Sequence, residues 1–215
     1  MEEDAFLFVF LMPEDVYIFG HFIFKEMLSM LKNTRSLTVM AALIALSIVL
    51  VSIIHFPLFP AAAFLEYDPG DIPILISAFS YGPIAALIIT ILASGIQALT
   101  VSASSGIYGF IMHIISTMAL CLPAGIIYSR KRTRVGALIA LLVGIVFVAC
   151  VMLVANHFIT PYFMGAPTEA VDAMLLPVIL PFNLIKAAIN CFVTMLIYKP
   201  LSKFVIKARQ EQEIL

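Results

Sequence analysis

Long apolar runs follow one another along this chain, as in LTVMAALIALSIVLVSII at residues 37–54. A helix that spans a membrane needs about 20 mostly apolar residues, because it must cross roughly 30 Å of hydrocarbon at about 1.5 Å per residue. Of the 215 residues, 63% are hydrophobic and only 12% are charged, whereas about half of a soluble domain is apolar. The sequence therefore predicts an all-α integral membrane protein.

A search for such runs gives six candidate spans, at residues 37–54, 72–81, 83–101, 107–128, 135–155 and 174–198. The second span is short and is followed by Gly82-Pro83, a pair that disfavours helix just before the proline. We therefore expect two helices joined by a sharp turn over residues 72–101. The alternative is one long, kinked helix, which leaves five spans and places the two termini on opposite sides of the membrane.

The distribution of Lys and Arg favours six spans, because cytoplasmic loops collect these residues. The loops at about 55–71, 102–106 and 156–173 contain no Lys or Arg. Six spans with both termini in the cytoplasm place every basic cluster on the cytoplasmic side, whereas five spans cannot. The basic residues lie before the first span, after the fourth and after the sixth: Lys32, Arg35, Arg130, Lys131, Arg132, Arg134, Lys199, Lys203, Lys207 and Arg209.

The domain organisation expected from these spans is a six-helix transmembrane domain at residues 33–205 and a cytoplasmic tail at residues 206–215. Residues 1–32 contain two apolar pieces that are too short to span and are split by Pro13-Glu14-Asp15. They also lack the basic start and the small-residue cleavage site of a signal peptide. We interpret them as an extension that is poorly ordered, interfacial or not native, with a natural start at Met27 or Met30 in the last case.

The segment LPFNLIKAAIN, residues 180–190, carries a lysine near the middle of the last span. A charge at that depth costs several kcal/mol, so an ionisable residue inside a span indicates a functional site. Lys186 is about 18 Å from either end of its span, farther than one side chain can reach. Asn183 and Asn190 share its helical face. The pattern predicts a polar pocket; an internal ion pair for Lys186 and helix packing for Asn190 are the alternatives.

Two outer loops, residues 59–73 and 156–172, mix aromatic side chains with carboxylates. Such loops can cover a pocket that holds a ring system, or the aromatic residues can anchor the protein at the membrane interface. Ala41 and Ala45 in the first span lie four residues apart, a spacing that lets a second helix approach closely. The aromatic residues considered for the pocket are Tyr67, Phe158, Tyr162 and Phe163.

Several classes of function have no support in the sequence. There is no zinc motif, no phosphate-binding glycine loop and no nucleophile elbow. Cys121, Cys150 and Cys191 fall in different apolar runs, and no basic patch suits nucleic acid. We therefore expect no enzyme activity, no metal and no cofactor, and any step driven by ATP would need a partner.

Three segments resemble the riboflavin-type substrate-binding S components of energy-coupling factor (ECF) transporters: LEYDPGDIPILISAFSYGPIAALI (65–88), IIYSRKRT (126–133) and LPFNLIKAAIN (180–190). The likeness covers about residues 36–204. The combination of an Asp-x-Pro element, a Gly-Pro turn and a final Pro-Phe-Asn-x-x-Lys is fairly specific, although no single piece would be. The resemblance implies the six-helix S-component fold in a bacterial cell membrane.

The resemblance also implies a function, namely capture of a vitamin from outside, most simply riboflavin, for ATP-driven import. The implied partners are membrane lipid, a transmembrane coupling subunit and two ATPase subunits. The family's flavin contacts carry over to Asn183 and Lys186, and its docking motif for the coupling subunit carries over to Ala41 and Ala45. Further candidate ligand-binding residues are Glu66, which could also balance the Lys186 charge, and Tyr67, Asn156, Tyr162 and His113.

The chain departs from the riboflavin-type pattern at two positions. Members often have Lys-Asn in the third helix, where this chain has Ala93-Ser94, and Asn in the fourth helix near His113. Another vitamin or ring compound is therefore an alternative ligand. A stand-alone secondary transporter is a further alternative, although the sequence shows no clear inverted repeat and no carboxylate inside a predicted span.

Overall fold

The structure, a computed structural model, describes residues 33–210. Residues 33–38 belong to one unit and the rest of the described chain to a second, and the fold given below is that of the second. The predictions for residues 1–32 and for the last five residues of the tail lie outside the described range.

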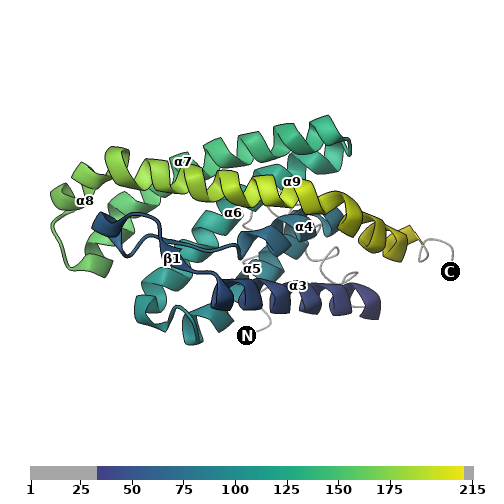
Figure 1. The fold of residues 1–215 in the computed structure, drawn as a ribbon, viewed down its shortest axis with the longest axis horizontal. Helices are drawn as coiled ribbons and strands as arrows, with labels where there is room; N and C mark the ends of the chain where they lie inside the picture. The colour runs from purple at the N-terminus through teal and green to yellow at the C-terminus, as the bar shows by residue number, and fades with distance from the viewer. Residues whose placement is uncertain (1–32, 211–215) are drawn as a thin grey trace, which may run out of the picture. The chain divides into compact units, whose positions relative to one another are not determined.

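Most of the chain is helical. The helices are α3 (Thr34–Ile53), α4 (Asp71–Tyr81), α5 (Pro83–Leu99), α6 (Gly106–Arg130), α7 (Arg134–Met164), α8 (Thr168–Met174), the π-helix η3 (Leu175–Ile179) and α9 (Leu180–Gln210). Short elements connect them: β1 (Phe56–Pro57), η1 (Pro60–Ala62), β2 (Glu66–Tyr67) and η2 (Ala103–Ser105). Figure 1 shows their arrangement. Within the described range, four segments are long and apolar enough to cross a membrane, and α4 and α5 are shorter apolar helices.

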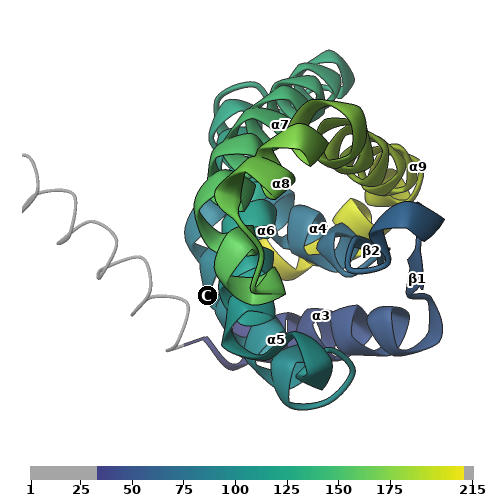
Figure 2. The same ribbon diagram turned by 90° about the vertical axis from the view of Figure 1, so that its left-hand side faces the viewer.

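α4 is the innermost helix of the bundle. Each residue from Asp71 to Ser80 is buried, and the side chains of Ile74, Leu75 and Ile76 have no exposed surface. The helix packs against α5, α6 and α9, as the end-on view in Figure 2 shows. A helix that is apolar on nearly all faces requires such a position, so the residues that start α4 lie at the centre of the protein.

The turn between α4 and α5 confirms the expected break at Gly82-Pro83, so a single kinked helix is wrong. Gly82 has φ 93° and ψ 178°, a conformation that glycine adopts without the steric cost of a Cβ. Its N–H donates to the Ala78 carbonyl oxygen at 3.1 Å, which closes α4. Pro83 then begins α5, where its missing N–H costs nothing.

The predicted loop at residues 156–173 is wrong, because most of it is helical. α7 continues through Pro161 and ends at Gly165, which adopts the left-handed conformation with φ 61°; α8 follows. Asn156 does not stop the helix because its side chain bonds within it. Its Nδ2 donates to the Met152 carbonyl oxygen at 2.7 Å, and its Oδ1 accepts from the Thr160 hydroxyl at 2.8 Å.

The connection between α3 and α4 crosses one end of the bundle. β1 and β2 pair antiparallel, with Phe56 opposite Tyr67, and this end also carries α8 (Figure 1). An apolar cluster joins the connection to α8, η3 and α9. Its buried members are Ala62, Leu65, Val171, Ile179 and Phe182. The connection is therefore packed down as a cover.

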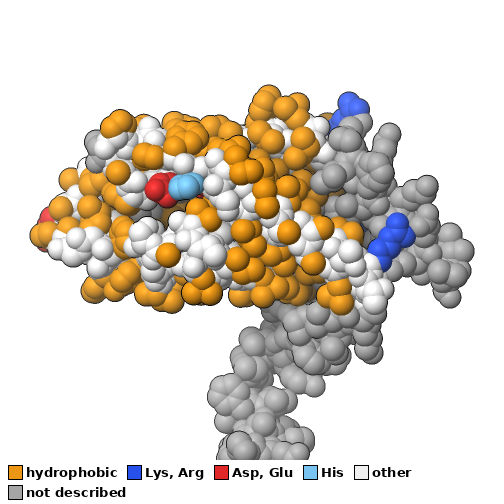
Figure 3. All heavy atoms as spheres, turned by 60° about the horizontal axis from the view of Figure 1, so that its bottom comes forward, with side chains coloured by type: hydrophobic (Ala, Val, Ile, Leu, Met, Phe, Trp, Pro, Cys, Tyr) orange, Lys and Arg blue, Asp and Glu red, His pale blue; other side chains and the backbone are white. Residues whose placement is uncertain are grey.

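Hydrophobic side chains also cover much of the outer surface, as on the face shown in Figure 3. On α7, Val146 and Val154 are 62% and 59% exposed, and on α9 Phe192 and Leu196 are 65% and 62% exposed. Extensive outward apolar surface of this kind fits contact with lipid.

Candidate functional site

A cavity lies beneath the α3–α4 connection, and α5, α6, α7 and α9 form its walls. It contains five of the residues selected from the sequence for ligand binding: Glu66, His113, Asn156, Asn183 and Lys186. Six further residues that line it are Phe64, Asp68, Ser94, Gln97, Tyr108 and Phe163.

An ion pair joins two walls of this cavity. Lys186 Nζ on α9 donates to Asp68 Oδ2 at 2.5 Å, and the two side chains are only 12% and 11% exposed. The counter-charge expected from Glu66 thus comes from Asp68, while Glu66 is exposed at the cavity. The sequence left two interpretations of Lys186 open, a polar pocket and an internal ion pair. This geometry is consistent with both, because the ion pair lines the cavity.

Asp68 stays ionised although it is buried. Burial by itself raises the pKa of its carboxyl, but the Lys186 ammonium and the Gly70 N–H favour the charged form, and the pKa is lowered below the ordinary value of 3.8. The Gly70 N–H donates to Asp68 Oδ1 at 3.0 Å. The pair is therefore a carboxylate and an ammonium at neutral pH.

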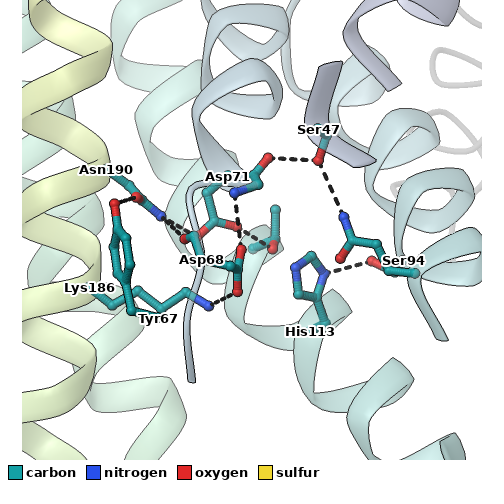
Figure 4. Close-up of polar contacts among 11 residues, drawn as sticks. Ser47, Tyr67, Asp68, Asp71, Ser94, His113, Lys186 and Asn190 are labelled. Carbon is teal, nitrogen blue, oxygen red and sulfur yellow. Dashed lines mark hydrogen bonds and ion pairs between the residues drawn. The ribbon is translucent and has the colours of Figure 1, made fainter. Parts of the chain in front are cut away.

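A second layer of polar contacts holds the start of α4 against α9 and α6 (Figure 4). Asn190 Nδ2 donates to the Asp68 carbonyl oxygen at 3.1 Å and to Asp71 Oδ2 at 3.0 Å. The Tyr67 hydroxyl donates to Asn190 Oδ1 at 3.1 Å, and the Thr117 hydroxyl donates to Asp71 Oδ1 at 2.6 Å. These contacts fit the alternative in which Asn190 packs helices together. They hold the segment that carries Asp68 against α9.

Asn183 uses its amide differently. Nδ2 donates to the Ile179 carbonyl oxygen at 2.8 Å, where the π-helix η3 joins α9. Its Oδ1 has no hydrogen-bond partner among residues 33–210, and the residue lines the cavity. Asn183 can therefore offer an acceptor one helical turn from the Lys186 ammonium.

His113 on α6 contacts Ser94 on α5. Ser94 Oγ lies 2.7 Å from His113 Nδ1, and both residues line the cavity. The other ring nitrogen, Nε2, is buried and has no hydrogen-bond partner in the described part of the chain. These are the two positions at which the sequence departs from the riboflavin-type pattern, and the structure brings them together.

Two of the predicted ligand residues do not line the cavity. Tyr67 is buried on the Asn190 side, and its ring contacts Phe56 with the centroids 5.5 Å apart. Tyr162 is 75% exposed, and Phe158, named with it, is 63% exposed. Phe163 does line the cavity.

Phe64 and Tyr108 supply the flat faces that sequence reasoning missed. The Phe163 ring centroid lies 6.4 Å from that of each of these rings. Phe64 lies in the α3–α4 connection and Tyr108 on α6, so only the folded arrangement of these segments brings them to Phe163.

The other candidate groups lie away from the cavity. Ala41 and Ala45 are exposed on α3, whereas Met40, Leu43 and Ser47 are buried on the opposite side of the same helix. Within residues 33–210, no group of three or more His, Cys, Asp or Glu side chains is placed to hold a metal ion.

Comparisons with known proteins give a consistent result. The family described as "ECF transporter, substrate-specific component" matches residues 35–198. Riboflavin transporter RibU of Staphylococcus aureus (strain TCH60) is 25% identical over 186 residues, which are 84% of this chain and 96% of that protein. Riboflavin transporter FmnP of Bacillus subtilis (strain 168) is 25% identical over 185 residues, which are 82% and 97% of the two chains.

A solved structure shares the fold. It was reported as "Structure and mechanism of the S component of a bacterial ECF transporter", and it matches with a TM-score of 0.70 and 25% identity over 81% of this chain and 98% of that one. The family match spans well over half of the sequence and includes every helix that lines the cavity. This multi-pass membrane protein belongs to the family of substrate-specific components of ECF transporters.

Proposed function

We propose that this protein is the substrate-binding subunit of an ECF-type vitamin importer in the bacterial cell membrane, and that its ligand is riboflavin. The observation that carries the proposal is the cavity itself, which combines a buried Lys186–Asp68 pair with aromatic walls. Similar proteins named as riboflavin transporters support the choice of ligand. Capture and release of the ligand need no catalytic group, so we propose no enzyme activity and no cofactor.

In the proposed complex, the isoalloxazine ring lies against Phe163, Phe64 and Tyr108, because flat apolar faces favour a ring system. The Lys186 ammonium has three N–H donors. Asp68 accepts one of them, and the others can bind ligand oxygen or nitrogen atoms. Asn183 Oδ1 and the amide of Asn156 lie on the neighbouring walls. The α3–α4 connection, with Glu66 at the cavity, then covers the bound ring.

The proposed orientation in the membrane follows from the basic residues. The α6–α7 turn and the end of α9 lie at the end of the bundle opposite the β1–β2 connection (Figure 1), and Arg130, Lys131 and Arg132 lie at that turn. The positive-inside rule supports a cytoplasmic location for this end and an outward-facing cavity. We further propose six spans with both termini in the cytoplasm, a transmembrane domain at residues 33–205 and a cytoplasmic tail at residues 206–215.

ATP-driven import requires partners, and we propose the coupling subunit and two ATPase subunits of the ECF module. Ala41 and Ala45 on α3 supply the proposed docking face. They are exposed and small, so a partner helix could approach the α3 backbone closely.

Replacing Ala45 with tryptophan is therefore expected to leave riboflavin affinity within about twofold and to abolish ATP-driven uptake, because the bulky side chain holds the partner helix away from α3. The measurement is riboflavin uptake by cells that also produce the ECF module, beside affinity of the purified subunit. Val146→Trp, at a position 62% exposed on the outer surface of α7 and away from the Ala41–Ala45 face, is the control and should transport normally. Normal uptake by the Ala45 variant would contradict the docking face.

The ligand proposal is tested by what the protein carries out of the cell. The subunit is purified in detergent, its visible spectrum is taken, and the released compound is identified by mass spectrometry. We expect a yellow protein that releases riboflavin at near one molecule per chain. Release of a different compound at that ratio would remove riboflavin as the ligand.

A further inference from the structure

The Ser94–His113 pair determines which ring nitrogen of His113 carries the proton. Ser94 is 2% exposed, so its hydroxyl proton needs an acceptor within the protein. Buried Thr90, one turn earlier on α5, donates to the Ala86 carbonyl oxygen of its own helix at 2.7 Å. Ser94 makes no such bond, and its polar contact within residues 33–210 is His113 Nδ1 at 2.7 Å.

The simplest satisfied arrangement is that Ser94 donates and Nδ1 accepts. Neutral imidazole has one donor and one acceptor nitrogen, so the proton then lies on Nε2. If Nδ1 were the donor instead, the buried Ser94 proton would have no acceptor in the described chain. His113 therefore presents Nε2–H, a buried donor with no partner among residues 33–210.

This donor faces the ion pair. In Figure 4 the bonded nitrogen of His113 points to Ser94 and the opposite side of the ring points toward Asp68, whose carboxylate lies between His113 and the Lys186 ammonium. All four residues line the same cavity. Each Asp68 oxygen accepts one bond, from Lys186 or from the Gly70 N–H, and each retains a lone pair. The side chains along this wall thus carry a donor, an acceptor and a donor in sequence.

We propose that His113 Nε2–H, the Asp68 carboxylate and the Lys186 ammonium together bind an imide edge, C(=O)–NH–C(=O), on the ligand, with Ser94 as the positioning residue that sets the His113 tautomer. An imide edge presents an acceptor, a donor and an acceptor, so it complements this row. The inference rests on the proposed function, because riboflavin carries such an edge on its pyrimidine ring. His113 then discriminates against flat ring compounds that lack the edge.

Two substitutions of His113 separate ligand binding from helix packing. The amide nitrogen of glutamine reaches about as far as Nε2, so His113→Gln keeps a donor toward the ligand and loses the Ser94 contact. The shorter asparagine amide reaches about as far as Nδ1, so His113→Asn keeps the Ser94 contact and loses the donor. We expect riboflavin affinity to fall about tenfold in His113→Asn and less than about threefold in His113→Gln.

Titration of riboflavin fluorescence with each purified protein gives the affinities. Unchanged riboflavin affinity in a folded His113→Asn variant, or a larger loss of affinity in His113→Gln than in His113→Asn, would overturn the inference. Either result would show that His113 only joins α5 to α6. The elution profile and thermal unfolding of each variant report folding separately. Failure of the unsubstituted protein to bind riboflavin would overturn the proposed function together with the inference, so the two failures are distinguishable.

The imide and the tautomer have their own readouts. For the unsubstituted protein, methylation of the imide nitrogen in N3-methylriboflavin is expected to weaken binding at least about tenfold, because the N–H that donates to Asp68 is lost. Equal affinity for the two compounds would overturn the assignment of Asp68 to the imide.

In ¹⁵N-histidine spectra, Ser94→Ala is expected to shift the His113 signals toward a mixture of tautomers, and unchanged signals would remove Ser94 as the positioning residue.

Discussion

Replacing Lys186 with methionine is expected to weaken riboflavin binding by about 100-fold or more, because the substitution removes a buried donor to the ligand and leaves the Asp68 carboxylate unpaired in the cavity wall. Methionine is similar in length, so the loss reports the charge more than the volume. The measurement is the equilibrium affinity of the purified variant by fluorescence quenching. Leu184→Met, on the exposed side of the same helix, is the control and should bind normally.

A double variant separates the ligand contact from the ion pair. In Lys186→Met with Asp68→Asn, no charge of the pair remains, so the desolvation cost of an unpaired carboxylate is removed. We expect the double variant to unfold near the temperature of the unsubstituted protein and still to bind riboflavin poorly. Near-normal affinity in a well-folded Lys186 variant would remove this residue from the proposed binding site.

The second large effect is expected for Asp68→Asn alone. The variant leaves the Lys186 ammonium without its counter-ion at 12% exposure, and removal of one partner of a buried pair costs about 3 kcal/mol or more. Unfolding in detergent, followed by the helical circular dichroism signal, measures this loss. Glu66→Gln is the matched control, because Glu66 is an exposed carboxylate near the same cavity. Equal destabilisation by the two variants would contradict the importance of the Asp68 pair.

The pH dependence of this contribution follows from the direction of the Asp68 pKa shift. Its carboxyl has a lower pKa in the folded protein than its ordinary value of 3.8. The folded state therefore binds the proton less readily than the unfolded state, and the pair stabilises the fold above the ordinary pKa. This stability is lost as the pH falls through the lowered pKa. The Asp68→Asn variant is expected to lack this acid-dependent loss.

The apolar runs of the sequence predicted most of the helices because span length is a property of the membrane and needs no tertiary information. Gly82-Pro83 likewise located the break between α4 and α5, since the backbone preferences of glycine and proline are local. Lys186 and Asn183 could be selected for a related reason. A polar side chain far from either end of an apolar helix needs a partner or a cavity wherever the rest of the chain lies.

The partner of Lys186 could not be identified in this way. Asp68 is 118 residues away in the sequence, and it is one of three acidic residues within six positions, Glu66, Asp68 and Asp71. Only the packing of this segment against α9 decides which of the three meets Lys186. Ser94 and His113 were read one at a time as departures from a pattern, whereas their meaning depends on a contact between α5 and α6.

The helical extension of α7 was missed for another reason. Asn156 and Pro161 both occur often in loops, and the sequence does not reveal that the Asn156 amide bonds to Met152 and Thr160 within the helix. This error also affected the prediction of the site residues Tyr162 and Phe163. A helix directs Phe163 toward the cavity and Tyr162 away from it, but a loop leaves both directions open.

The central claim is that riboflavin binds in the cavity that contains Lys186 and Asp68. The most direct measurement is a titration of the purified, ligand-free subunit with riboflavin, followed by quenching of flavin fluorescence. We expect saturable binding at one riboflavin per chain, and no displacement of riboflavin by a vitamin without an imide edge, such as thiamine. A folded subunit that leaves riboflavin fluorescence unchanged up to millimolar ligand would contradict the claim.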